Sequence, residues 1–149
     1  MKLNIKNTFT TQLPADPITD NSRRQVTKAC YSFVTPKQTA KSELIHVSPE
    51  MLDTLGFSEN DAKTKQFLNV FTGNTVFEGT TPYAMCYGGH QFGHWAGQLG
   101  DGRAINLFEV EHNNKNWKLH PFLLSISHIS VIIMTSNPIM TLRTLYQRK

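Results

Sequence analysis

The residues best suited to chemistry in this chain lie between Tyr87 and Arg103, where six of the nine glycines are gathered with two histidines and a tryptophan. Because each glycine inside a helix costs roughly 1 kcal/mol relative to alanine, we expect this stretch to form a shaped loop. At its end, Gly100 and Gly102 flank Asp101 and precede Arg103. Two glycines around one residue let backbone N–H groups converge, and the arginine adds a positive charge with a bidentate fork. This combination predicts a site for phosphate.

A structural interpretation of the same glycines competes with the phosphate site. Asp-Gly between strand-like segments is also the strongest short-range signal for a tight hairpin turn. The residues 104–110 have the β-branched and aromatic content of a strand, so an ordinary turn fits Gly100 to Arg103 as well. These four residues alone leave both interpretations open.

A second chemical hypothesis is a metal-binding module built from Cys86, His90 and His94, which follow one another at four-residue spacing. On a helix this spacing would place the three side chains on one face, as in zinc sites. The three glycines between them argue against a helix and weaken this hypothesis. Without a metal, we expect His90 to brace the glycine-rich stretch through hydrogen bonds.

The stretch from Tyr87 to Arg103 reads Tyr-Gly-Gly-His-Gln-Phe-Gly-His-Trp-Ala-Gly-Gln-Leu-Gly-Asp-Gly-Arg. It resembles the signature of the selenoprotein O family (SelO, called YdiU in bacteria), whose usual form is Y-A/S-G-H-Q-F-G-x-W-A-G-Q-L-G-D-G-R. A match of this length, with Trp, His and Gln at fixed places, is highly specific. His94 departs from it, because the family usually has glycine or another small residue there, and we expect its side chain to crowd the loop.

The resemblance implies a protein-kinase-like fold and a protein adenylyltransferase, which transfers AMP from ATP to Ser, Thr or Tyr hydroxyls of other proteins with Mg²⁺ or Mn²⁺. UMP transfer by bacterial members is the alternative. Position by position, Gly100, Gly102 and Arg103 fall on the residues that hold the nucleotide phosphates. The resemblance therefore assigns these three residues to ATP binding, and it assigns no catalytic residue and no metal ligand to this chain.

The resemblance covers roughly residues 8–119 and then stops. In the family, the strand that begins at the tryptophan continues to a lysine that grips the phosphates, and Phe122 stands at that position here. We expect 1–119 to be the N-terminal part of a kinase-fold domain and 120–149 to be a poorly ordered tail, on the hypothesis that a frameshift replaced the rest of a longer protein. Such a chain would be inactive alone, and a non-catalytic interaction protein or structural remnant is the alternative.

Composition is that of a folded soluble protein. The 149 residues are 39% hydrophobic and 17% charged, which supports one modest core. The net charge of +4 does not indicate a nucleic-acid partner, because 1–110 hold ten Lys/Arg against ten Asp/Glu and the excess lies in 111–149, which hold five against one. Cys30 and Cys86 lack a C-x-x-C pattern, which suits free thiols in a reducing compartment. With no secretory signal and no apolar run long enough for a membrane span, we expect a cytoplasmic protein without membrane partners.

The predicted elements belong to an α+β fold, a partial kinase-like N-lobe with a small, mostly antiparallel sheet and two short helices. An N-cap at Ser48 and a stop at Gly56 bound the first helix, and a second helix runs from Ser58 to Gly73. The strands are predicted over 29–34, 44–47, 83–87 and 103–110, with a hairpin loop over 113–116 and a returning strand from 117.

Two further segments are interpreted as surface. Residues 8–17 contain two prolines and no clear period, so we expect them to run extended. The paired arginines Arg23 and Arg24 read as a solvated flank.

Overall fold

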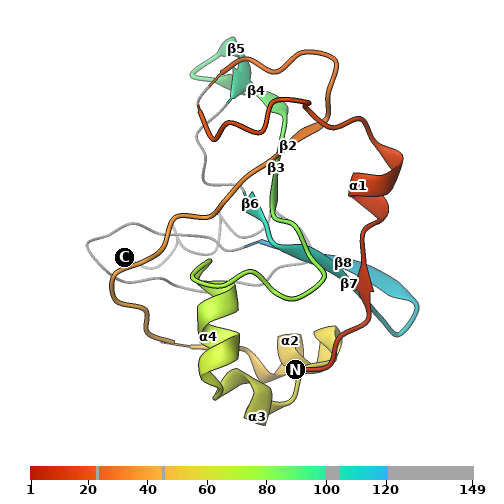
Figure 1. The fold of residues 1–149 in the computed structure, drawn as a ribbon, viewed down its shortest axis with the longest axis vertical. Helices are drawn as coiled ribbons and strands as arrows, with labels where there is room; N and C mark the ends of the chain where they lie inside the picture. Colours follow the sequence, from red (N-terminus) through yellow and green to blue (C-terminus); the bar gives the residue numbers. More distant parts are fainter. Residues whose placement is uncertain (23, 45, 100–104, 121–149) are drawn as a thin grey trace.

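The computed structural model describes residues 1–120 apart from 23, 45 and 100–104. In chain order the elements are β1 (Ile5–Lys6), α1 (Thr8–Gln12), β2 (Tyr31–Phe33), α2 (Pro49–Leu55), α3 (Glu59–Ala62), α4 (Lys65–Phe71), β3 (Tyr83–Met85), β4 (Tyr87–Gln91), β5 (His94–Leu99), β6 (Ile105–Asn106), β7 (Phe108–His112) and β8 (Lys115–Leu119). Helices α2, α3 and α4 lie at one end of the molecule and strands β4 and β5 at the other (Figure 1). The α+β class is confirmed, although the described residues form four short helices where two were predicted.

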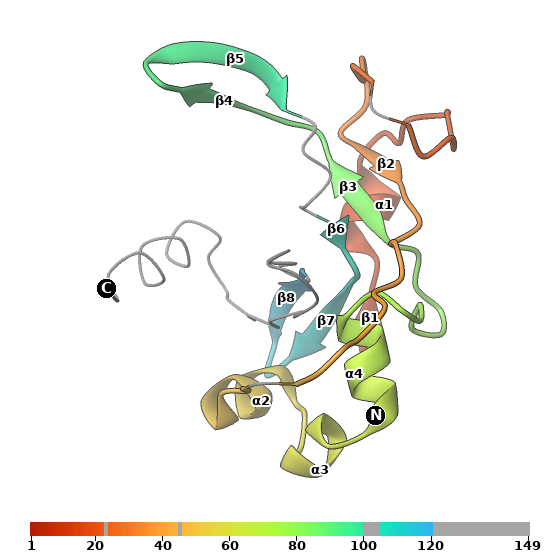
Figure 2. The same cartoon turned by 90° about the vertical axis from the view of Figure 1, so that its left-hand side faces the viewer.

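Within the described residues, three small antiparallel sheets replace the single sheet that the sequence predicted. Their strand orders are β1-β7-β8, β2-β3-β6 and β4-β5. Figure 2 shows the β4–β5 pair standing out from the other two sheets as a separate ribbon. The turn between β7 and β8 consists of Asn113 and Asn114, with φ of 50° and 58°, which is the backbone that a two-residue hairpin turn requires. The predicted hairpin is therefore confirmed with a shorter turn, because β8 already begins at Lys115.

Local capping residues determine where the helices begin and end. The Ser48 hydroxyl accepts a hydrogen bond from the Met51 amide at 3.2 Å, and α2 ends at Gly56 with a φ of 77°, as predicted. The single helix predicted from Ser58 to Gly73 is wrong. A capping box at Ser58 starts α3, and Thr64 then caps α4 separately by accepting from the Phe67 amide at 3.1 Å.

The hydrophobic core lies between these helices and sheet β1-β7-β8. An aromatic cluster at its centre joins Phe67 to Phe71 at 4.4 Å and to Phe57 at 5.5 Å between ring centroids. The fully or nearly fully buried members are Leu52, Leu55, Phe57, Ala62, Phe67, Val70, Phe71, Leu107, Phe108, Val110 and Leu119. This core makes the helical end of the molecule its stable base.

A buried carboxylate explains why residues 8–12 of the segment predicted to be extended form helix α1, while Leu13 after it is extended. Glu109 of β7 accepts hydrogen bonds from the Thr8 amide at 3.1 Å and the Phe9 amide at 3.3 Å, which satisfies the first N–H groups of α1. The Tyr83 hydroxyl donates to the same carboxylate at 3.2 Å. Burial and this neighbouring carboxylate raise the pKa of Tyr83 above its usual range, so the phenol keeps its proton and stays a donor.

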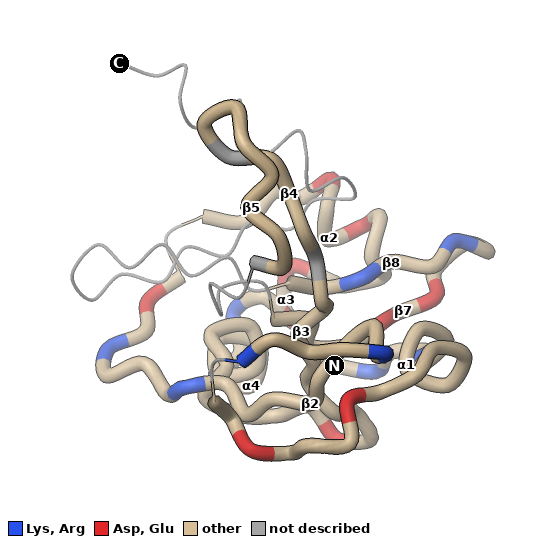
Figure 3. Tube along the Cα trace, turned by 90° about the horizontal axis from the view of Figure 1, so that it is seen from above, with Lys and Arg blue, Asp and Glu red and all other residues tan. Residues whose placement is uncertain are grey.

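The remaining strand predictions are confirmed in part. Strands β2 and β3 lie inside the predicted 29–34 and 83–87, and the predicted 103–110 contains β6 and the first residues of β7. Residues 44, 46 and 47 are not in a strand, so that prediction is wrong. Charges of both signs are interspersed along the described trace (Figure 3). Among the described helices, none has the length and apolar character needed to cross a membrane.

Candidate functional site

Residues 87–99 of the glycine-rich stretch form a β-hairpin, where composition predicted a shaped loop. Strand β4 pairs antiparallel with β5, and the tip is Phe92-Gly93, with φ of 51° and 81°. Gly88 faces Gln98 while His90 faces Trp95, so β5 holds one residue more than β4 between these two pairs. This bulge includes Gly97, whose φ of 71° suits glycine. Glycines are thus used at the tip and the bulge of a strand pair.

Aromatic packing across the hairpin accounts for another glycine. The His90 ring meets the Trp95 ring edge-on at 5.1 Å between centroids. A Cβ atom on Gly88 would lie 2.8 Å from the Trp95 ring and 2.9 Å from the Gly97 carbonyl oxygen, so the tryptophan occupies the space that a side chain would need. His90 thus makes an aromatic contact in the hairpin, and His94 is exposed and pairs with Gln91.

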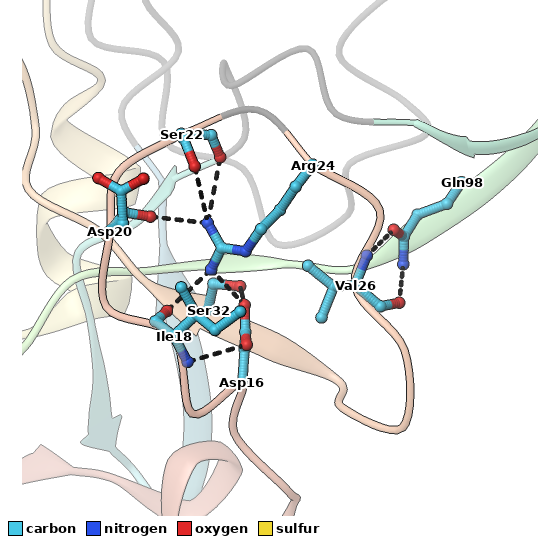
Figure 4. A network of polar contacts seen from close by, with 8 residues as sticks. All are labelled: Asp16, Ile18, Asp20, Ser22, Arg24, Val26, Ser32 and Gln98. Carbon is cyan, nitrogen blue, oxygen red and sulfur yellow. Dashed lines mark hydrogen bonds and ion pairs between the residues drawn. The ribbon is translucent and has the colours of Figure 1, made fainter.

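A single glutamine side chain anchors the hairpin to the N-terminal part of the chain. The Gln98 carbonyl oxygen accepts from the Val26 amide at 2.6 Å, and its NH₂ group donates to the Val26 carbonyl at 2.9 Å (Figure 4). The two bonds satisfy both backbone groups of one residue, as a strand partner would. Gln98 therefore fixes the backbone of β5 one residue before that strand ends.

The segment that Gln98 grips is itself held by a network around Arg24. The guanidinium pairs with the Asp16 carboxylate and donates to the Ile18 carbonyl at 2.8 Å and the Asp20 carbonyl at 2.7 Å. The Ser32 hydroxyl of β2 donates to Asp16 at 2.8 Å. Figure 4 shows Arg24 at the centre of the turn that these residues form. The prediction that Arg24 is a solvated flank is wrong, because its side chain is only 20% exposed.

The neighbouring hydrogen-bond donors and the Arg24 charge keep the Asp16 carboxyl of this network ionised. The Ile18 amide, which donates to Asp16 at 3.0 Å, contributes most to lowering the pKa of that carboxyl, and Ser32 and Arg24 act in the same direction. Asp16 is buried at 7% exposure, so its charge depends on these donors. Sequence reasoning missed Asp16 and Arg24, and it left Gln98 without a role although this residue stands in the family signature.

The predicted phosphate-binding residues Gly100, Gly102 and Arg103 lie outside the described residues. The structure does describe the residues on both sides of them. Strand β5 leads in from Leu99, behind the Gln98 anchor, and β6 leads out from Ile105, which pairs with Ala84 of β3. Asn106, which is completely buried, follows in β6 and donates to the Tyr83 carbonyl at 3.4 Å. Both ends of the segment are therefore tied to strands of the fold.

The metal-module hypothesis finds no site in the part of the chain that the structure describes. Within it, no group of three or more His, Cys, Asp or Glu side chains is placed to hold a metal ion. Lys118, which does not stand where the family has its phosphate-gripping lysine, lies 3.8 Å above the Phe9 ring and 4.0 Å from Glu109. Its contacts belong to the packing of α1 on the sheet.

Comparison with known proteins agrees with the signature. A family model described as protein adenylyltransferase SelO matches residues 19–122, which include the whole glycine-rich stretch. The chain is 52% identical over 117 residues to the protein nucleotidyltransferase YdiU of Flavobacterium johnsoniae, a match that covers 78% of this chain and 22% of that protein. The YdiU of Methylobacillus flagellatus is 48% identical over 118 residues, covering 78% of this chain and 23% of its own length.

The family description and the names of these relatives specify one class of protein, the nucleotidyltransferases that act on proteins. The chain belongs to the SelO family, as the length of the family match and the shared signature show. It spans about a fifth of the length of the curated relatives it matches.

Proposed function

We propose that this chain supplies the nucleotide-phosphate-binding part of a protein adenylyltransferase that transfers AMP from ATP to Ser, Thr or Tyr hydroxyls of proteins. The observation that carries the proposal is the signature from Tyr87 to Arg103, which stands inside the matched residues 19–122. In this proposal the backbone N–H groups around Gly100 and Gly102, together with the Arg103 guanidinium, bind the phosphates of ATP.

The described residues support a positioning role for the hairpin. From Gly79 to Gly100 the sequence has no Lys, Arg, Asp or Glu, so Arg103 would approach the phosphates without a competing charge from the hairpin strands. The Gln98 anchor and the β3–β6 pairing hold the two ends of the segment. Phosphate binding by backbone dipoles is effective when the dipoles are held in place before the ligand arrives, because no ordering cost is then paid on binding.

The divalent metal that the family resemblance implies would have to be held by other residues. In the described part no three carboxylate, histidine or cysteine side chains gather as ligands, so they do not fit a Mg²⁺ or Mn²⁺ ion and no step is derived through one. We likewise propose no catalytic base in this chain. Activity of the whole protein would need the residues that the longer relatives possess beyond the matched part.

Two finer points belong to the same proposal. The strands that follow the glycine-rich hairpin would form part of a kinase-like N-lobe, with β6, β7 and β8 after the phosphate-binding segment. The transferred group would be AMP, because the family is described as an adenylyltransferase. The relatives are named only as nucleotidyltransferases, which keeps UMP transfer as the competing reaction.

Titration calorimetry with ATP tests the proposal on the chain itself. With so few contacts we expect a dissociation constant of about 1 mM or weaker, and loss of the signal in Arg103→Ala. Lys115→Ala, which removes the same charge from an exposed position at the β7–β8 turn, should bind ATP as the wild type does. UTP in place of ATP compares the two transfer reactions at the level of binding.

Equal binding of ATP by the wild type and Arg103→Ala would contradict the assignment of Arg103. Absence of any nucleotide binding would favour the alternative of a non-catalytic interaction protein. The chain alone should transfer no AMP to a protein substrate, which autoradiography with labelled ATP measures. AMP transfer by the 149 residues would show that the residues of the longer relatives beyond the matched part are not needed for activity.

A further inference from the structure

The two cysteines of the chain, which are 56 positions apart in the sequence, face each other across one strand pair. In the β2–β3 ladder Tyr31 pairs with Met85 and Ser32 with Ala84. One step further in the same register, the Cys86 amide donates to the Cys30 carbonyl at 2.8 Å. This backbone hydrogen bond places the two thiol residues next to each other just beyond the named strands, where Cys30 lies in a bend.

The alternation of β2 and β3 indicates a shared face for the two side chains. Successive residues of a strand point to opposite faces, so continuing each strand by one residue puts Cys30 and Cys86 on the face of Ser32 and Ala84. The aromatic side chains of Tyr31 and Tyr83, whose rings meet at 5.4 Å, occupy the other face. Both thiols are free and each cysteine is partly exposed, so a small reagent can reach them.

The backbone spacing of such a pair suits a disulfide. Directly opposed residues that share a ladder hydrogen bond have Cα atoms about 5.5 Å apart, and bridged cysteines have Cα atoms about 4.4 to 6.8 Å apart. Cys30 is held from its other side as well, since its amide donates to the Pro14 carbonyl at 2.9 Å. The fold therefore holds the two backbones beside each other, at a spacing that a disulfide can bridge.

The polar surroundings of Cys86 agree with this closeness. Burial raises the pKa of the Cys86 thiol, and the Asp16 carboxylate and Cys30 raise it further, while Arg24 opposes them. Cys86 thus keeps its proton more firmly than an exposed cysteine. Since the thiolate is the species that attacks a disulfide, its reaction accelerates as the pH rises.

We propose that Cys30 and Cys86 form a modification site, a dithiol that a small-molecule disulfide oxidises reversibly to a cross-strand disulfide. One cysteine thiolate attacks a sulfur of the reagent, whose S–S bond breaks and releases one thiol. The second cysteine then attacks the protein sulfur of this mixed disulfide and releases the other thiol. The two cysteines lose two electrons, the reagent gains them, and the two protons end on the released thiols.

The position of this bond gives it a structural effect. Cys86 immediately precedes β4, so the disulfide would tie the root of the glycine-rich hairpin to β2 by a covalent link. The polar contacts of Gln98 also join the same hairpin to the N-terminal segment. Oxidation would therefore restrict motion of the hairpin about its root. This inference stands apart from nucleotide binding and can hold whether or not ATP binds.

Treatment of the reduced 149-residue protein with oxidised glutathione tests the proposal, with N-ethylmaleimide as quench and intact mass spectrometry as readout. The native protein should lose about 2 Da, carry no glutathione and no maleimide, and yield one linked peptide pair containing Cys30 and Cys86. Ring closure from the mixed disulfide should be at least about tenfold faster in the native protein than in concentrated urea, since the fold holds the thiols together.

Single variants provide the matched controls. Cys30→Ser and Cys86→Ser should each stop at one bound glutathione. The proposal is overturned if the native wild type retains two glutathiones, forms disulfide-linked dimers, leaves both thiols unreacted, or closes the ring no faster than the unfolded chain. The native and unfolded comparison uses the wild type alone, so it decides the matter even if a serine variant fails to fold.

Discussion

The helical base and the glycine-rich hairpin are built on different physical principles. In the base, α2 and α4 bury aromatic and aliphatic side chains against β7 and β8, and Phe67 is fully buried. At the hairpin tip Phe92 is fully exposed, and Trp95 is 63% exposed. The base is held by removal of apolar surface from water, whereas the hairpin is held by its own ladder and the two hydrogen bonds of Gln98.

The base therefore determines the stability of the fold, whereas the contacts of the hairpin determine where the hairpin lies. A packed core contributes most of the free energy of folding, and the loss of one core ring is felt by the whole molecule. A projecting strand pair adds little apolar burial, so its contacts govern where it lies more than whether the chain folds. A ligand-binding segment that follows such a hairpin can be adjusted by local contacts without changing the base.

A Phe→Ala substitution in each region should give the largest difference in the free energy of unfolding. Phe67→Ala removes a ring from the aromatic cluster with Phe57 and Phe71, and should lower the free energy of unfolding by about 3–5 kcal/mol. Phe92→Ala removes an equal ring from water and should change it by less than about 0.5 kcal/mol. Urea denaturation followed by tryptophan fluorescence measures both. Similar losses in the two variants would contradict the division into base and hairpin.

A smaller, local effect is expected at the hairpin anchor. Gln98→Leu leaves the Val26 amide and carbonyl without their partner, which costs about 1 kcal/mol per hydrogen bond. Hydrogen exchange at Val26 and in the hairpin should accelerate by roughly ten- to thirtyfold, with little change in the overall melting temperature.

Gln66→Leu is the matched control for this anchor, because Gln66 is exposed on α4 in the base. It should leave hydrogen exchange in the hairpin unchanged. A Gln98→Leu variant whose hairpin exchanges as slowly as that of the wild type would show that other contacts hold the hairpin in place.

The base was largely predictable because its signals are local. Ser48, Gly56 and Ser58 mark helix ends through hydrogen bonds to residues within a few positions, and each of these boundaries is where the sequence placed it. The break between α3 and α4 was missed because Thr64, which caps α4, lies in the middle of the segment that was assigned to one helix. The two asparagines at 113 and 114 likewise identified their turn by residue type alone.

The rest depended on partners far away in the sequence. Helix α1 is capped by Glu109, which lies 100 positions after Phe9, so nothing within 8–17 could indicate it. The sequence around Arg24 predicts a solvated charge, because its ion-pair partner Asp16 is eight positions earlier and no local motif indicates the turn between them. Gln98 stood in a recognised signature, but its partner Val26 is 72 positions earlier and no motif specifies it. The family resemblance identified the glycine-rich stretch, while its hairpin form follows from strand pairing that composition does not encode.

Acid gives the smallest expected effect in the comparison of the two regions, because each region contains an aspartate whose pKa is lowered. In the base, the Ser58 amide and hydroxyl lower the pKa of Asp61. At the root of the hairpin, the Ile18 amide, Ser32 and Arg24 lower the pKa of Asp16. A lowered folded-state pKa contributes stability that is present above the unfolded value and is lost as the pH falls through the folded value. Both contributions should therefore be intact at pH 7 and disappear below about pH 4, near the ordinary aspartate value.

Carboxyl titration by NMR should give midpoints below 3.8 for both residues. The fall in melting temperature between pH 5 and pH 3 should be smaller in Asp61→Asn and in Asp16→Asn than in the wild type, because each variant lacks one of the two groups. Hydrogen exchange distinguishes the regions: acid should loosen the segment around Val26 through Asp16, while Asp61 acts on α3. A midpoint at or above 3.8 for Asp16 would mean that the Ile18 amide, Ser32 and Arg24 do not hold that carboxylate. The polar network at the hairpin root would then contribute less to positioning than the hydrogen bonds of Gln98.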